Sequence, residues 1–201
     1  DMDISDPNAT IEAIKQVEEA GLHYELIDNL GYGYIGINAE RVPDINVRKG
    51  LMSLMNREPA IETYYGELAS VIERPMSMVS WAYPEGAEAV YPFSPEKALE
   101  YFKAAGYEQV NGQLVKDGKQ LKIEVGIGGE GTMDHPSAPI LTQMKAEMEK
   151  MGAVLEINDC DTNILFDRLN SHSWDMWVAA WSADMDPDMY QVYSSKGPSN
   201  Y

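Results

Sequence analysis

The chain has 201 residues, of which 44% are hydrophobic, enough to fill the core of one large α/β domain or two small ones. Its 33 Asp and Glu against 15 Lys and Arg give a formal net charge of −18, which repels phosphate backbones and anionic lipids and argues against a nucleic-acid partner. The single cysteine, Cys160, excludes an internal disulfide and a multi-cysteine metal site, and no apolar run approaches the ~20 residues that cross a bilayer.

The first predicted elements are a helix and two short strands. Ile11, Ile14 and Val17 lie on one apolar stripe of a helix over residues 8–20, and Gly21 ends that helix. Residues 23–27 form one candidate strand, and residues 31–38 form the other.

The second candidate strand divides its side chains between two faces, because successive residues of a strand point to opposite sides. One face carries two tyrosines, a glycine and an asparagine: Tyr32, Tyr34, Gly36 and Asn38. Glycine is costly inside a strand, which indicates that another backbone or a ligand approaches closely. The alternative is a strand packed under a helix with tyrosine rings at its edge. We therefore treat Tyr32, Tyr34 and Asn38 as candidate ligand contacts.

Two helices and a long loop follow. Residues 44–55 have apolar side chains at helical spacing, and a second helix follows a tight corner and ends near Gly66. Pro, Ser and Gly interrupt residues 73–91 without a clean period, so we expect a long ordered loop that contains Trp81 and Tyr83. Long loops inside compact domains are often functional.

The second half of the chain predicts alternating helices and strands. Ser94 caps a helix that ends at Gly106. Asp117 and Gly118 supply the turn of a hairpin whose second strand spans residues 119–127. Two further helices and two further strands complete the pattern: residues 137–151 and 161–169, and residues 153–157 and 174–181. Such alternation implies crossover connections and a partly parallel sheet, so we expect an α/β fold.

The last strand carries the strongest candidate site. Residues 174–181 form an apolar run, which is typical of a strand covered on both faces, and its carboxyl end is where open α/β sheets bind ligands. Trp181 and Asp184 follow at this end, so both are candidate ligand contacts. Asp186 and Pro187 are typical of a helix start, which makes Asp186 a predicted cap.

Two motifs resemble catalytic or cofactor sites but lack the context that those sites need. Residues 126–131 match the G-x-G-x-x-G pattern, yet no helix is predicted to start at that loop, and Glu130 and Asp134 would repel phosphates. Residues 94–97 match the S-x-x-K pattern, but its companion motifs are absent. We expect no bound cofactor.

The acidic residues after the last strand also resemble a known site. Asp184, Asp186 and Asp188 match the start of a calcium loop, but the loop's glycine and its final glutamate are absent. The three histidines are too far apart in sequence to indicate a local ligand pair, so we expect no metal site. A hydrolase that uses Asp184 with Asp186 as paired carboxylates stays open as an alternative.

Four stretches of the chain, in this order, resemble the bacterial extracellular solute-binding proteins of family 5, which serve peptide and nickel ABC importers. The stretches are residues 34–38 with 47–61, residues 94–107, the hairpin at Gly118 and Lys119, and residues 175–190. The resemblance implies a periplasmic-binding-protein-like (type II) lobe, with a mixed, mostly parallel sheet flanked by helices. Residues 1–201 would then be a single lobe, an excised fragment whose partner lobe is absent.

The resemblance also implies site residues. In peptide-binding relatives, an acid after a W-x-x-D pattern pairs with the ligand's α-ammonium group, and that acid falls on Asp184. Trp181 occupies the aromatic position of the same cleft. Residues 177–180 offer no Arg or Lys for the carboxyl end of a peptide. Arg168 is the nearest basic residue, and we expect it to be an exposed helical arginine.

The implied function is the substrate-binding component of an ABC importer, which captures a small solute, an oligopeptide or dipeptide, between two lobes and performs no chemistry. The expected partners are that ligand, ABC permease subunits in the membrane and the missing second lobe. The expected location is extracytoplasmic, in the periplasm or on the outer face of the membrane, with a lipid anchor on the full-length protein. The alternatives are the carboxylate hydrolase, an adaptor domain, and a family member that binds a nickel complex, an opine or a sugar.

Overall fold

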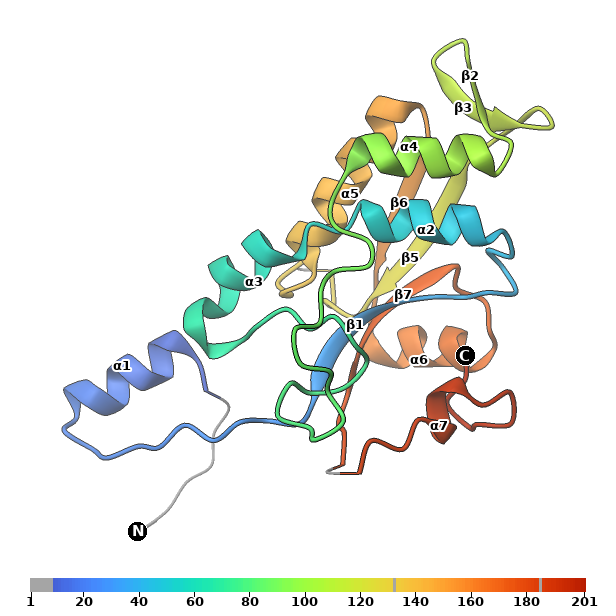
Figure 1. Cartoon of the computed structure of the whole chain (residues 1–201). Coiled ribbons are helices and arrows are strands. Elements are labelled where there is room, and N and C mark those ends of the chain that lie inside the picture. The colour runs from blue at the N-terminus through green and yellow to red at the C-terminus, as the bar shows by residue number, and fades with distance from the viewer. Residues whose placement is uncertain (1–8, 132, 185) are drawn as a thin grey trace.

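A four-stranded mixed sheet forms the centre of the computed structural model, which describes residues 9–131, 133–184 and 186–201 (Figure 1). Its strands lie in the order β1 (Tyr32–Ile37), β7 (Met176–Trp181), β5 (Lys122–Ile127) and β6 (Val154–Asp159). β5 pairs in parallel with both β6 and β7, whereas β1 pairs antiparallel with β7. The predicted α/β fold with a mixed, mostly parallel sheet is therefore confirmed.

Helices cover both faces of this sheet. The larger core lies between one face and three helices: α2 (Ile45–Ser53), α4 (Pro95–Ala104) and α5 (Ala138–Met151). Ile123, Val125 and Ile127 of β5 point into this core, as the alternation of the strand predicts. A smaller cluster on the other face joins α6 (Thr162–Asn170) to Trp174 and Trp177. Figure 1 shows α6 on the side of the sheet away from α2 and α4.

Local capping interactions determine where several helices begin and end. The side chain of Ser94 accepts a hydrogen bond from the Lys97 N–H, and Asp44 and Asp161 cap α2 and α6 in the same way. Gly152 ends α5 in the left-handed conformation that favours glycine. These ends agree with the sequence prediction.

The remaining elements lie around this centre. They are the helices α1 (Ile11–Glu19) and α3 (Arg57–Tyr65), the 3₁₀ turn η1 (Gly66–Leu68), the short helix α7 (Tyr190–Tyr193), and a small sheet of β2 (Glu108–Val110), β3 (Gln113–Lys116) and β4 (Lys119–Gln120). α1 has no buried residue and projects from the body of the fold (Figure 1). No helix in the described ranges is long and apolar enough to cross a membrane.

Three predicted elements differ from the structure. Residues 23–27 form no strand, because no neighbouring strand pairs with them, and Leu26 and Ile27 remain exposed. The strand predicted over residues 119–127 divides at Leu121, because its first part pairs with β3 and its second part joins the main sheet. No helix starts at Pro187: α7 begins at Tyr190, whose N–H donates to Asp188, so Asp186 is not a cap.

Candidate functional site

One face of the β1–β7 pair carries a row of aromatic rings. The register places Tyr32 opposite Trp181, Tyr34 opposite Ala179, and Gly36 opposite Trp177. A Cβ atom at Gly36 would overlap the indole ring of Trp177, so the glycine provides the space for that ring. The close approach predicted at this strand is therefore made by a side chain of the neighbouring strand rather than by another backbone or a ligand.

A cavity of about 240 Å³ opens where this row reaches the carboxyl end of β7. Three of the five predicted contacts, Tyr32, Trp181 and Asp184, line it together. The other lining residues are Leu30, just before β1, and residues from the loop after η1 and from the segment between β7 and the end of α7: Pro75, Met76, Ser77, Ser80, Ser182, Ala183, Asp186, Pro187, Asp188, Met189, Gln191, Val192 and Tyr193. The location is the one that the carboxyl ends of parallel strands favour for ligands.

The charges around the cavity are all negative. Asp184, Asp186 and Asp188 line it and are exposed, whereas no Lys, Arg or His belongs to the described lining residues. These carboxylates do not converge on a metal position, since no group of three His, Cys, Asp or Glu among the described residues could hold a metal ion. The arrangement favours a ligand with an organic cation, such as an ammonium group.

Aromatic rings form an uncharged part of the same cavity lining. Burial, and then the neighbouring Tyr193 and Tyr34, raise the pKa of Tyr32 to about 12. Tyr32 is therefore a neutral phenol at physiological pH, able to donate and to accept a hydrogen bond. The half-buried indole of Trp181 lies directly across the strand pair from it. Indole and phenol rings present negative faces that attract cations.

The loop wall of the cavity is held by contacts outside the site. The Ser77 hydroxyl donates to the Asn29 carbonyl at 3.3 Å, and the Arg57 guanidinium forms two hydrogen bonds with the Glu73 carboxylate at 2.8 and 3.0 Å. The Glu73 N–H donates to the Tyr83 hydroxyl at 3.0 Å. The predicted long loop over residues 73–91 is thus held in place by these hydrogen bonds, and part of it lines the cavity. None of its lining residues was among the predicted contacts. Their polar, aperiodic sequence carries no signal that separates them from neighbouring loop positions.

Tyr34 and Asn38 do not line the cavity. The Tyr34 hydroxyl accepts a hydrogen bond from the Trp177 indole at 3.3 Å, and its ring lies edge-on to the Trp177 ring. Asn38 is only 2% exposed, and its side-chain oxygen accepts from the backbone N–H groups of Glu40 and Arg41 at 2.9 and 3.2 Å. In this geometry Tyr34 supports the aromatic row, and Asn38 stabilises the turn after β1.

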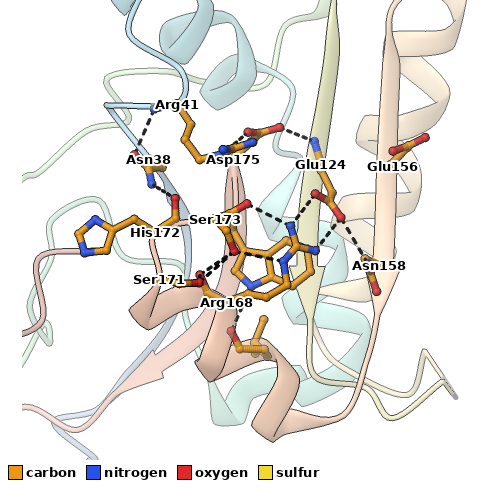
Figure 2. A network of polar contacts seen from close by, with 12 residues as sticks. Asn38, Arg41, Glu124, Glu156, Asn158, Arg168, Ser171, His172, Ser173 and Asp175 are labelled. Carbon is orange, nitrogen blue, oxygen red and sulfur yellow. Dashed lines mark hydrogen bonds and ion pairs between the residues drawn. The ribbon is translucent and has the colours of Figure 1, made fainter.

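A polar network fixes the opposite end of β7 (Figure 2). Arg168 donates to both carboxylate oxygens of Glu124 at 2.8 Å, and its guanidinium lies 3.4 Å from the centroid of the Trp174 ring. Asp175 accepts from the Glu124 N–H at 2.9 Å and from Arg41 at 2.8 Å. The expectation of an exposed helical Arg168 was wrong, because these partners hold its side chain at the amino end of the strand, away from the cavity.

Two ionisable side chains in or near this network, Glu124 and Cys160, have shifted pKa values. Hydrogen bonds from Arg168 are the main reason that the pKa of Glu124 lies below its ordinary value. Burial, and then Asp159, raise the pKa of the partly buried Cys160 thiol, which disfavours the reactive thiolate.

The glycine-rich motif at residues 126–131 is not followed directly by a helix, since α5 begins only at Ala138. A Cβ atom at Gly126 would lie 2.6 Å from the Trp174 ring, so this glycine provides space for that ring.

Comparison with known proteins identifies the family of this chain. The model for "Bacterial extracellular solute-binding proteins, family 5 Middle" matches residues 1–201. The oligopeptide-binding protein AppA of Bacillus subtilis is 27% identical over 176 residues, which cover 83% of this chain and 31% of AppA. The dipeptide-binding protein of Escherichia coli is 23% identical and matches 97% of this chain and 36% of its own length.

Solved structures share the fold. AppA in complex with a nonapeptide superposes with a TM-score of 0.71 at 25% identity, covering 82% of this chain and 33% of AppA. NikZ from Campylobacter jejuni, in complex with Ni(L-His), superposes with a TM-score of 0.69 at 20% identity, covering 91% of this chain and 36% of NikZ. The chain spans about a third of the length of these relatives. The chain belongs to the bacterial extracellular solute-binding proteins of family 5, and its fold is that of a type II periplasmic-binding-protein lobe.

Proposed function

We propose that this chain is one lobe of the substrate-binding component of an ABC importer, and that it binds the ammonium group of an oligopeptide or dipeptide. The observation that carries the proposal is the cavity at the end of β7, where Asp184 and Trp181 lie together and no lining residue described by the structure is basic. The family to which the chain belongs is one of solute-binding proteins, which favours capture over catalysis.

The physical basis is the behaviour of charges in a closing cleft. An ammonium group beside a carboxylate gains little in bulk water, but the attraction strengthens as the second lobe displaces water from the site. The indole of Trp181 offers a flat apolar surface and a face for a cation, and it loses little conformational freedom on binding. Asp184 would therefore pair with the ligand's ammonium group, while Trp181 and Tyr32 pack against it.

A peptide fits this arrangement better than a purely anionic solute. AppA was solved with a nonapeptide, and another relative is a dipeptide-binding protein. The cavity of about 240 Å³ is smaller than the ~300–1,000 Å³ of typical ligand sites, so this lobe would hold one end of the ligand. The carboxyl end would contact groups outside this cavity, because its described lining offers no Lys or Arg.

The proposed partners follow from this role. A second lobe of the same protein would close over the ligand, and permease subunits in the membrane would receive it. The protein would act outside the cytoplasm, in the periplasm or anchored by lipid to the outer face of the membrane. An isolated lobe would bind weakly, because a closing cleft needs both walls to bury the ligand.

Isothermal titration of the full-length protein with the tripeptide Ala-Leu-Ala and its N-acetylated form tests the proposal. The free peptide should bind and the acetylated peptide should not, because acetylation removes the positive charge. Asp184→Asn should weaken binding of the free peptide by about 10- to 100-fold, the usual effect of losing one member of a buried charge pair.

Glu149→Gln is the matched control, since it removes one exposed carboxylate from α5, outside the cavity lining. It should bind the free peptide as the wild type does. Equal binding of the free and acetylated peptides would contradict the proposal. So would hydrolysis of the peptide that Asp184→Asn abolishes, because that result would make the chain part of a carboxylate hydrolase.

A further inference from the structure

α1 and the extended segment after it, residues 22–27, form a helix–strand unit that lies outside both hydrophobic cores. α1 has no buried residue, and Figure 1 shows it projecting to one side of the fold. Its first turn lines a hollow of about 280 Å³ with Tyr64, Tyr65 and Leu68, yet Ile11 remains exposed there. The unit therefore contributes little to the packing that holds the rest of this lobe together.

Local hydrogen bonds give this unit a defined shape. Gly21 adopts a left-handed conformation after α1, and the Leu22 N–H donates to the Val17 carbonyl at 3.1 Å, which ends the helix in the way that glycine favours. The Tyr24 hydroxyl donates to the Glu18 carboxylate at 2.9 Å, which ties the extended segment back to the helix. The unit is thus held together by its own contacts.

The extended segment has the side-chain pattern of a strand with one buried face. Leu22, Tyr24 and Leu26 alternate with His23 and Glu25, so the three apolar side chains share one side. The His23 imidazole lies 3.5 Å from the Glu25 carboxylate on the other side. The apolar side chains are all exposed, that of Leu26 by 58%, and no strand in the described ranges pairs with this segment. An unpaired backbone beside an apolar face is a template for adding a strand to another sheet.

The second lobe of the full-length protein is the partner that fits this unit. Leu30 lines the binding cavity, and the Ser77 hydroxyl donates to the Asn29 carbonyl, so the segment joins this lobe at the cavity that the second lobe would close. The match covers 31% of AppA and 36% of the dipeptide-binding protein, so most of each relative lies outside this region. A second copy of the chain is disfavoured, because two chains with a formal charge of −18 repel each other.

We propose that α1 and residues 22–27 pack in the second lobe, with residues 22–27 as a strand of that lobe's sheet and their apolar face in its core. The lobe described above then comprises residues 30–201, in place of the residues 1–201 expected from the sequence. This inference rests on the function proposed above, which supplies the second lobe, and it adds the segment that joins the two.

Hydrogen exchange of the full-length protein, followed by mass spectrometry, tests the strand. The backbone N–H groups of residues 23–27 should exchange about 100-fold more slowly than in the urea-unfolded protein, because strand pairing protects them. β7, which pairs on both sides, supplies the reference for a protected strand. Exchange of residues 23–27 at the rate of the unfolded chain would overturn the inference.

Photo-cross-linking identifies the partner. p-Benzoylphenylalanine in place of Tyr24 keeps an aromatic ring on the apolar face and bonds to a neighbouring C–H group on irradiation. In the full-length protein, the cross-link should join position 24 to sequence outside these 201 residues of the same molecule. A cross-link to residues 30–201, or one between two molecules, would overturn the inference, since the segment would then pack on this lobe or on a second copy.

An added charge on the apolar face measures its burial. Leu26→Asp should lower the Tm of the full-length protein by about 4 °C or more, because a carboxylate would enter a core without a partner. Ile164→Asp is the matched control: Ile164 is 51% exposed in the first turn of α6, where an acid is favourable, so the Tm should change by about 1 °C or less. Equally small changes in both variants would contradict the burial. If Leu26→Asp does not fold, the exchange and cross-linking experiments still decide, because neither uses that variant.

The outcomes separate the inference from the function on which it rests. Protection of residues 23–27 and a cross-link to the second lobe, in a protein that does not bind Ala-Leu-Ala, would support the packing and overturn the proposed function. Binding of that peptide by a protein whose residues 23–27 exchange freely would overturn the inference and leave the proposed function standing.

Discussion

Alanine substitutions at two glycines of β1 should change stability in opposite directions. Gly36 lies opposite Trp177, and a Cβ atom there would overlap the indole ring. Gly33 of the same strand is itself exposed, and the nearest atom to its added Cβ would be the Ala179 carbonyl oxygen at 4.0 Å, an ordinary contact. The same substitution in one strand therefore meets a closed space at one position and an open space at the other.

The expected magnitudes follow from two opposing terms. Replacing a strand glycine by alanine reduces the entropy lost on folding, which stabilises by roughly 0.5–1 kcal/mol. Overpacking a filled core costs about 1–3 kcal/mol, and Trp177 is only 6% exposed and cannot turn aside freely. Gly36→Ala should thus destabilise the protein by about 1–2 kcal/mol, whereas Gly33→Ala should stabilise it by about 0.5 kcal/mol.

Urea unfolding of the two variants and the wild type measures both signs. In a thermal melt, Gly36→Ala should lower the Tm by about 2–8 °C, given a change of ~2–4 °C per kcal/mol for a chain of this size. A Gly36→Ala variant as stable as the wild type would refute the packing of Trp177 against this strand, and with it the register that places Tyr32 beside Trp181.

Three further predictions concern the core, the polar network and the cavity wall. Phe102→Ala should lower the free energy of unfolding by about 3–5 kcal/mol, because Phe102 is fully buried, whereas Phe166→Ala, at a side chain 43% exposed, should cost about 1 kcal/mol or less in the same urea series. Glu124→Gln should cost about 1 kcal/mol at pH 7. Because Arg168 holds the pKa of Glu124 below its ordinary value of 4.5, this contribution is present above pH 4.5 and is lost as the pH falls through the folded-state pKa, so urea curves of variant and wild type should converge in acid. The raised pKa of Tyr32, about 12 against an ordinary value of 10.0, stabilises the fold below pH 10 and ceases to do so as the pH rises toward 12. Tyr32→Phe should therefore lose less stability than the wild type over that range, and a parallel decline of the two would contradict the burial of the Tyr32 phenol.

Elements with local signals could be predicted from the sequence. Ser94, Asp44 and Asp161 begin helices because their side chains satisfy backbone N–H groups a few residues away, and Gly152 ends one because it adopts a left-handed conformation. The apolar alternation of β5 depends only on which face meets the core. Such features need no knowledge of distant residues.

Features that depend on distant residues could not be predicted in the same way. Whether Tyr32 or Tyr34 lines the cavity depends on Trp177, which lies about 140 positions away in sequence and packs on Tyr34. The strand expected over residues 23–27 lacks a partner strand, which its own alternation could not reveal. Most of the cavity lining comes from irregular segments whose positions depend on tertiary contacts, such as the Arg57 pair with Glu73.

A crystal structure of the full-length protein with a bound peptide tests the central claim most directly. The peptide's ammonium nitrogen should lie within hydrogen-bond distance of the Asp184 carboxylate, about 2.7–2.9 Å, with the Trp181 indole against the same residue of the ligand. An ammonium group bound elsewhere, or Asp184 paired with a basic side chain of the protein when the lobes close, would contradict the account.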